Sequence, residues 1–181
     1  MFLLSWRVIA AASLTLTAAT ACAPPATVAA MVPDPAIMAG RAPAPAYRNA
    51  ISLGSVSVGR DIGTPWTSAV GPDEVREALA RMLSSAQLGQ GANGRFRLDA
   101  MLLGLTRPYA GFAMTVTASI AYRLTDAASG ALVYDKVLTG LGTATLDDAI
   151  TNENRLRIAD QRAVGANLQQ LLQDLYSLPP R

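Results

Sequence analysis

Apolar residues follow two different periods along the chain, and each period predicts a type of element. Strict alternation of apolar and polar residues, which is typical of half-buried strands, is most regular in FAMTVTASIAYRL. In ISLGSVSV the apolar residues change parity at Gly54, which indicates a strand with a bulge. The predicted strands are residues 51–58, 95–105, 112–124 and 131–145, and the turn TDAASG joins the last two into a hairpin.

Two other segments repeat their apolar residues at helical spacing. The first is 71–89, where we expect Gly89 to end the helix in a left-handed conformation. The second runs from about residue 148 to 176, and its apolar stripe follows two rows: Ala159, Ala163, Leu171, Leu175, and Leu156, Val164, Leu168, Leu172. Small residues occupy its first half and leucines its second half. We therefore expect this helix to approach the sheet closely at its start.

The order of these elements, β-α-β-β-β-α, predicts one α+β domain over residues 50–178. Its expected architecture is a four-stranded mixed sheet with two helices on one face. The second face of the central strand carries Thr, Ser and Ala side chains, so this face is either wet or available to a partner.

The segment before the domain has a different composition. Residues 22–49 contain six of the eleven prolines and no sustained period of 2 or 3.6. We interpret the segment as a Pro/Ala-rich tether, which at about 3.1 Å per residue would reach about 80 Å. The alternative is that part of it packs along the domain, with Val32, Ile37 and Met38 as anchors.

The chain begins with the anatomy of a secretory signal peptide. Arg7 supplies a positive charge, and residues 8–18 form an apolar core that is too short to span a bilayer. The sequence ATAC at residues 19–22 resembles a bacterial lipobox, in which the cysteine is acylated and becomes the new amino terminus. We therefore predict a lipoprotein signal peptide over residues 1–21 and lipid attachment at Cys22.

Two details qualify this lipobox. Ala19 and Ala21 also satisfy the small-x-small rule of ordinary signal cleavage, so a soluble periplasmic product stays open. Residue 23 is Ala and not Asp, and the resemblance then implies sorting to the outer membrane. If the family chemistry holds, Cys22 carries three acyl chains, palmitate among them, which anchor more firmly than a single chain.

Composition excludes several classes of function. Loss of the leader removes one of 15 basic residues and leaves 14 against 13 acidic ones, so a nucleic-acid-binding surface is not expected. The chain has no histidine, which removes the commonest general base and most transition-metal sites. Cys22 is the only cysteine, so no internal disulfide can form. We predict neither a metal nor a cofactor.

The remaining polar candidates have ordinary structural interpretations. Asp147 and Asp148 precede a helix and match its dipole. Arg97 and Asp99 share one strand face and are expected to form a surface ion pair. Asn167 interrupts the apolar stripe of the last helix, where a satisfied buried amide is the first interpretation and a ligand contact the second.

One turn has the composition of a protein contact site. The sequence TRPYAGF places Arg107, Tyr109 and Phe112 at one end of the sheet, a mixture favoured in protein recognition sites. Ordinary turn prolines and strand-end aromatics would explain the same residues.

The lipobox, the proline-rich segment and the single β-α-β-β-β-α domain together resemble the small envelope lipoproteins of Gram-negative bacteria. The domain plan is similar to that of the lipopolysaccharide-assembly lipoprotein and of the auxiliary lipoproteins of lipid-transport ABC systems. A long tether is also similar to that of the lipoprotein activators of peptidoglycan synthases. The lipopolysaccharide-assembly lipoproteins differ in that their domain usually begins directly after the cysteine. No residue motif beyond 19–22 carries the resemblance.

The resemblance implies a non-enzymatic accessory or docking subunit of an envelope assembly or transport machine. It would be anchored in the outer membrane through acylated Cys22, face the periplasm and bind an envelope protein. The alternative is a periplasmic lipid- or glycolipid-binding module with its ligand between helices and sheet. An enzyme would require a pocket that gathers Asp61, Asp99 or Lys136 around a hydroxyl group.

Overall fold

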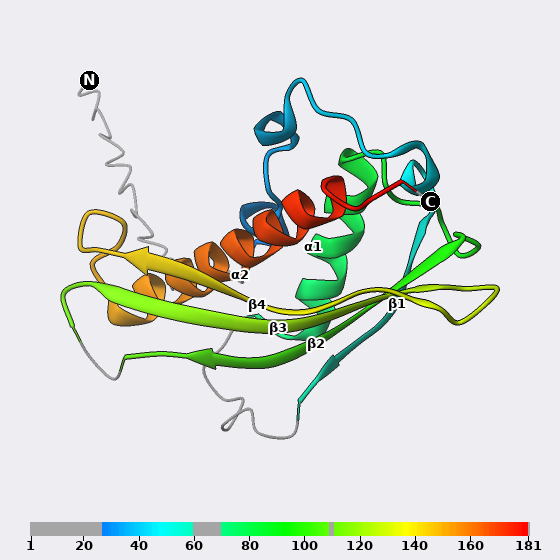
Figure 1. Ribbon diagram of the computed structural model, residues 1–181. Helices are drawn as coiled ribbons and strands as arrows, with labels where there is room; N and C mark the ends of the chain where they lie inside the picture. Colours follow the sequence, from blue (N-terminus) through cyan, green and yellow to red (C-terminus); the bar gives the residue numbers. More distant parts are fainter. Residues whose placement is uncertain (1–26, 60–69, 109–110, 181) are drawn as a thin grey trace, which may run out of the picture.

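Four strands form one mixed sheet in the computed structural model, which describes residues 27–59, 70–108 and 111–180 (Figure 1). The strands are β1 Ile51–Val58, β2 Phe96–Thr106, β3 Met114–Asp126 and β4 Leu132–Ala144, and they lie in the order β1-β2-β3-β4. β1 is parallel to β2, and the other neighbours are antiparallel. The register of β1 and β2 shifts between Leu53 and Val56, so the bulge expected at Gly54 is confirmed.

Two helices cover one face of this sheet and leave the other face open (Figure 1). α1, Pro72–Ser85, connects β1 to its parallel neighbour β2, and α2, Asn152–Tyr176, follows β4. The predicted α+β architecture is therefore confirmed. The strand residues that face the helices are buried as the alternation requires: Phe96, Leu98, Ala100, Leu102, Met114, Val116, Ala118, Ile120, Tyr122 and Leu124.

The helix ends differ from the sequence expectation in two places. Gln87, with a φ of 56°, takes the left-handed position after α1 that was expected for Gly89. α2 begins at Asn152 and not near Asp148, because the Asp148 carboxylate accepts a hydrogen bond from the Thr145 N–H at 2.9 Å and closes a separate turn. Thr151 then caps the helix by accepting from the Asn154 N–H at 3.3 Å.

The first half of α2 lies directly on β4, as its small residues predict. A side-chain carbon added at Gly142 would overlap the backbone of Ala159 and Ala163, and one added at Gly140 would overlap the backbone of Ala163 and Asn167. Two glycines on the strand and two alanines on the helix thus allow the backbones to meet. Farther along α2, Leu168, Leu171, Leu172 and Leu175 fill the wider space and are buried.

The described part of the proline-rich segment packs against the domain. Three short 3-10 helices, η1 Val28–Met31, η2 Pro35–Met38 and η3 Pro45–Tyr47, bring Met31, Met38 and Tyr47 into the core. The Tyr47 ring lies 4.9 Å from that of Phe96, and its hydroxyl donates to the Pro179 carbonyl at 3.2 Å.

The tether interpretation is therefore wrong for residues 27–49, whereas residues 22–26 lie outside the described residues. Prolines 35 and 45 begin short helical turns here, because a fixed φ suits a first helical position as well as an extended chain. Of the three alternative anchors, Met38 is buried, Val32 is partly buried and Ile37 is exposed. The main anchors, Met31 and Tyr47, were not among the residues expected to pack.

The contact between α2 and β4 can be tested by adding one methyl group. Gly142→Ala should lower the free energy of unfolding by about 3 kcal/mol, because the added carbon meets backbone atoms that cannot rotate away. Gly104→Ala is the matched control, since nothing lies within 4 Å of a side-chain carbon at that position, and it should change stability by less than about 1 kcal/mol. Urea denaturation of both variants measures the difference. Equal stability of the two variants would contradict the close approach.

Candidate functional site

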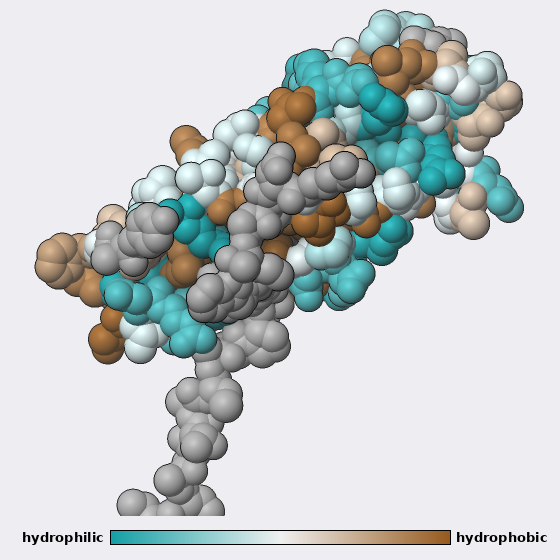
Figure 2. Space-filling model, turned by 90° about the horizontal axis from the view of Figure 1, so that it is seen from below, coloured by the Kyte–Doolittle hydropathy of each residue, from teal (hydrophilic) through white to brown (hydrophobic). Residues whose placement is uncertain are grey.

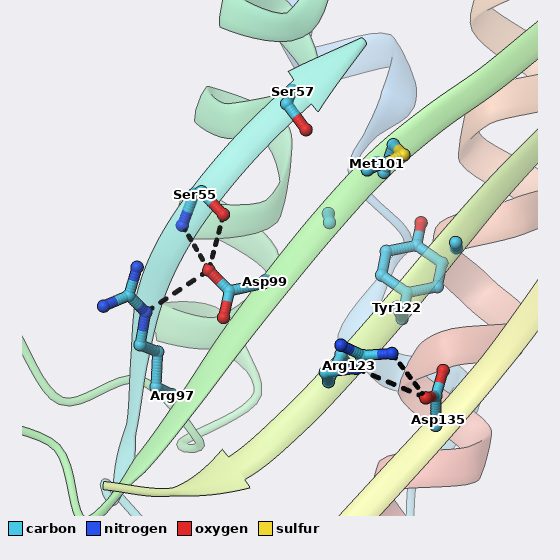
Figure 3. Close-up of a pocket in the computed structure, with 10 residues that line it drawn as sticks. Ser55, Ser57, Arg97, Asp99, Met101, Tyr122, Arg123 and Asp135 are labelled. Carbon is cyan, nitrogen blue, oxygen red and sulfur yellow. Dashed lines mark hydrogen bonds and ion pairs between the residues drawn. The ribbon is translucent and has the colours of Figure 1, made fainter. Parts of the chain in front are cut away.

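The open face of the sheet carries a pocket of about 520 Å³ (Figure 3). Neighbouring residues from all four strands line it, and most of them are polar or charged: Ser55, Ser57, Arg97, Asp99, Ala100, Met101, Ala121, Tyr122, Arg123 and Asp135. The polar face expected from the alternation of β3 is therefore hollowed at this place.

Asp99 is the most constrained of the charged groups in this pocket. Its Oδ1 atom accepts hydrogen bonds from the backbone N–H and the hydroxyl of Ser55, both at 2.6 Å, and from Arg97 Nε at 3.3 Å. Burial alone would raise the pKa of Asp99, but the bonds from Ser55 and Arg97 outweigh burial, so this pKa lies below its usual value. Asp99 is thus a fixed carboxylate, and the surface pair expected for Arg97 and Asp99 is confirmed.

A second ion pair lies between β3 and β4, where Arg123 Nη2 donates to Asp135 Oδ2 at 3.0 Å. Arg123 and Asp135 are direct cross-strand neighbours, so their side chains project from the same face. Apolar side chains accompany these ion pairs on the face, since Met101, Val137 and Leu141 are 44%, 59% and 63% exposed. Figure 2 shows hydrophilic and hydrophobic residues interleaved on this side of the molecule.

The edges of the sheet are less available than its face. At the β1 edge, the Gln90 N–H donates to the Ile51 carbonyl at 2.8 Å and Arg76 donates to the Gly54 carbonyl at 3.0 Å. At the β4 edge, α2 supplies Arg162 to the Thr143 carbonyl at 2.6 Å and Gln170 to the Thr139 carbonyl at 2.9 Å. These contacts occupy backbone acceptors that an added strand would need. A partner therefore has better access to the face than to either edge.

The residues of the turn TRPYAGF, which was predicted as a contact site, have different surroundings. Arg107 forms a two-pronged ion pair with Asp160 of α2, with N–O distances of 2.9 and 3.0 Å, and Asp160 is 1% exposed. Arg107 therefore attaches the turn to the helix. Phe112 is 83% exposed, and Tyr109 lies outside the described residues, as does Cys22. A contact role for this turn stays a prediction.

Asn167 is a satisfied buried amide, in agreement with its first interpretation. Its Oδ1 accepts from the Tyr122 hydroxyl at 2.8 Å, and its Nδ2 donates to the carbonyls of Ala118 at 3.1 Å and Leu138 at 2.7 Å. This side chain joins α2 to β3 and β4 and is fully buried. Its contacts are all within the domain core.

Asp160 is the residue that sequence reasoning missed. It falls in the α2 row of Leu156 and Val164, as Asn167 falls in the row of Ala163 and Leu171. Each apolar row is thus interrupted by one polar residue. The interruption was interpreted for Asn167 alone, although the same signal was present for Asp160.

The other acidic and basic candidates have structural partners. Asp148 accepts from Arg162 at 2.6 and 2.8 Å, and Asp174 accepts from Lys136 at 2.9 Å and from the Tyr134 hydroxyl at 2.7 Å. Within 27–59, 70–108 and 111–180 no group of three or more His, Cys, Asp or Glu could hold a metal ion. Asp61 lies outside these ranges. Among the described helices, none is both long enough and apolar enough to cross a membrane.

Comparison with known proteins shows similarity of fold. No family model and no curated protein matches the chain. Protein XCC0632 from Xanthomonas campestris, of the DUF330 family, matches with a TM-score of 0.52 and 14% identity over 75% of this chain and 88% of its own. This match supports the α+β plan.

Two lipoproteins are more distant structural neighbours. A minor lipoprotein from Acinetobacter baumannii matches with a TM-score of 0.48 and 13% identity, over 75% of this chain and 98% of its own. Lipoprotein GNA1162 from Neisseria meningitidis matches with a TM-score of 0.39 and 10% identity, over 70% of this chain and 97% of its own. The resemblance to the lipopolysaccharide-assembly lipoprotein stays a prediction.

Measurements of the free energy of unfolding can distinguish a structural role of Asn167 from a role as a ligand contact. Asn167→Leu should cost about 2 kcal/mol or more, because it leaves the buried Tyr122 hydroxyl without its acceptor. Adding Tyr122→Phe should recover part of this loss, since the unsatisfied hydroxyl is then removed. Gln169→Leu, at an exposed position of the same helix, is the control and should stay within about 0.5 kcal/mol of the parent. A double variant no more stable than Asn167→Leu would contradict the assignment.

The lowered pKa of Asp148 should make the stability of the fold sensitive to acid. Bonds from Arg162 and from the Thr145 N–H lower its pKa from 3.8 to about 2. A carboxyl group with a lowered pKa stabilises the fold above its unfolded pKa and loses this contribution as the pH falls toward its folded pKa. The free energy of unfolding should therefore decrease less steeply between about pH 5 and about pH 2 in Asp148→Asn than in the parent. Arg162→Gln, which removes the donor, should flatten the same slope, and unchanged slopes in urea titrations would refute the assignment.

Proposed function

We propose that this protein is a non-enzymatic outer-membrane lipoprotein whose domain docks on another envelope protein. The observation that carries the proposal is the sheet face that α1 and α2 leave uncovered, where two ion pairs surround a pocket and exposed apolar residues lie beside them. The predicted lipobox at residues 19–22 supports membrane attachment through Cys22. The partner is then a component of an envelope assembly or transport machine, and the domain faces the periplasm.

The composition of this face suits a protein partner. Interfaces combine apolar contact area with charged groups that fix register and orientation. Met101 and Val137 provide apolar area, and the pair of Arg123 with Asp135 provides two charges already held in place. Because this ion pair is formed before binding, a complementary partner would lose little further side-chain entropy when it contacts these groups.

The pocket does bring Asp99 to the Ser55 hydroxyl, which is one arrangement that an enzyme would require, but the chemistry of the face supports a binding role more than a catalytic one. Asp99 is held ionised by three hydrogen bonds, whereas a general base needs a pKa near the working pH. Lys136 lies over the Tyr134 ring at 5.4 Å, and its amino group donates to Asp174 at 2.9 Å, so this group already has a partner within the domain. We therefore propose that the protein is not an enzyme.

The lipid-binding alternative has little support along α2. A ligand between helices and sheet would need space where Gly142 and Ala159 bring the two backbones together. The leucines of the second half are buried against the strands and fill that part of the interface. We favour docking through the open face for this reason.

A charge swap tests docking without removing the ion pair. A photo-reactive residue at Val137, which is exposed on the open face, should crosslink a specific envelope protein in cells. The double variant Arg123→Asp with Asp135→Arg should lower the yield by about tenfold, because it keeps the local attraction but reverses the charges seen by the partner. Exchanging Glu77 and Arg81, an exposed pair on α1, is the matched control and should leave the yield unchanged.

A Cys22→Ala variant is tested in the same experiment. If the anchor brings the domain to its partner, this variant should leave the membrane fraction and should no longer crosslink the partner. Retention of this variant in the outer membrane would contradict the lipid anchor. Failure to recover any specific protein with several crosslinkers, or equal yields from both charge swaps, would contradict the docking role.

A further inference from the structure

The two most exposed large apolar side chains of the described residues lie at one end of the sheet, and Leu146 lies at the same end. Ile150 is 89% exposed and Phe112 is 83% exposed, and Leu146 is 49% exposed. We call these three residues the apolar end cluster. Hydrophobic residues are visible at the same end in Figure 2, where the loops between β2 and β3 and between β4 and α2 lie.

A buried arginine holds the two loops of this cluster together. Arg155 of α2 is 3% exposed and donates to the carbonyls of Ala149 at 3.0 Å and Ile150 at 2.7 Å in one loop. It also donates to the Gly111 carbonyl, at 3.4 Å, in the other loop. The pairing of the strands also places these two loops at the same end of the sheet, because Met114 at the start of β3 pairs directly with Ala144 at the end of β4. Arg155, which solvent hardly reaches, therefore joins the backbone at Ile150 to the residue that precedes Phe112.

The opposite end of the sheet differs in composition. There the β3–β4 hairpin turn is Ala127-Ala128-Ser129-Gly130, and Asp126 binds its backbone at 3.1 Å and 3.0 Å. This turn offers only small side chains to a surface. Leu132 beside this turn is 53% exposed, so the strongest apolar exposure, that of Phe112 and Ile150, lies at the end that contains Arg155.

The course of the chain brings a lipid anchor within reach of that end. η1 packs on α2 beside Gly165, and Thr27 follows Cys22 by only five positions. At about 3.6 Å per residue the anchor lies at most about 18 Å from Thr27. Gly165 stands 13 positions after Asn152, and at 1.5 Å per residue this part of α2 is about 20 Å long. The maximum reach of the anchor is therefore of the same order as the length of α2 between η1 and the cluster.

We propose that the apolar end cluster rests in the interfacial layer of the membrane that holds the acyl chains of Cys22. The inference depends on the lipid anchor of the proposed function. Aromatic and aliphatic side chains enter this layer readily, and the anchor removes most of the entropy cost of bringing them to it. The domain then lies against the bilayer instead of extending far from it.

Local charge defines the kind of lipid surface. Asp147 and Glu153 flank the cluster and are exposed, so attraction to anionic lipid is not the source of binding. Burial of apolar surface is the source, and the contact should therefore depend little on salt. A zwitterionic surface, such as that of phosphatidylethanolamine, fits these charges.

A fluorescent label on single cysteines tests the contact. Acylated Cys22 has no free thiol and the chain has no other cysteine, so a cysteine at a chosen position can be labelled uniquely. The variants are Phe112→Cys and Ile150→Cys, with Ala128→Cys at the opposite end as the control. Each full-length protein is purified in acylated form, labelled with the fluorophore NBD and reconstituted into phosphatidylethanolamine vesicles that contain doxyl-labelled lipid. Mass spectrometry of the amino terminus confirms acylation.

The proposal expects quenching and a blue shift of the emission at positions 112 and 150, at low and at high salt, and neither change at position 128. Labels at 112 and 150 that remain unquenched while the protein stays with the vesicles would overturn this inference and leave the anchor intact. Protection of these positions only when an envelope protein is added would also overturn it, in favour of a protein contact. A parent protein that is not acylated would instead refute the lipid anchor, and the inference with it.

Discussion

The direct contact between the backbones of α2 and β4 determines the arrangement of the rest of the domain. Gly140 and Gly142 leave room for the helix, and Ala159 and Ala163 present no larger side chain to them. Because the helix is so close, Asn167 reaches carbonyls of both β3 and β4, and Arg162 and Gln170 reach the outer edge of β4. The same contact places the start of α2 at the end of the sheet, where Arg107 meets Asp160 and Arg155 meets the two loops.

This arrangement leaves the charged residues in two groups with different roles. Asp160 and Arg155, which belong to α2, are buried and join the helix to segments that are distant in the sequence. Those on the open face, such as Arg123 and Asp135, are exposed and contribute little to stability as isolated pairs. Their geometry therefore supports the proposed docking role more than it supports the fold. The occupied edges of the sheet favour the same conclusion, because they direct a partner to the face.

The packing of residues 27–50 changes how the domain is related to its anchor. A proline-rich composition is equally compatible with an extended chain and with a series of short 3-10 turns, since proline restricts φ in both. Here Met31 and Tyr47 decide between the two, because burying them in the core gains more than an extended chain would. The length available to a tether is reduced from 28 residues to the few that follow Cys22. With the proposed anchor at Cys22, the domain would lie close to the membrane surface.

The sequence by itself determined the order of elements, the inward faces of β2 and β3 and the close approach of α2. These features depend on local periodicity and residue size, which neighbouring positions reveal. It also indicated the buried amide of Asn167, because a polar residue interrupted an apolar row. Only the tertiary structure decided that Asp160 is the partner of Arg107, that Met31 and Tyr47 enter the core, and that Phe112 and Ile150 lie together. Each of these depends on contacts between residues more than 35 positions apart, and no period along the chain records which distant segment will complete a buried surface or a buried charge.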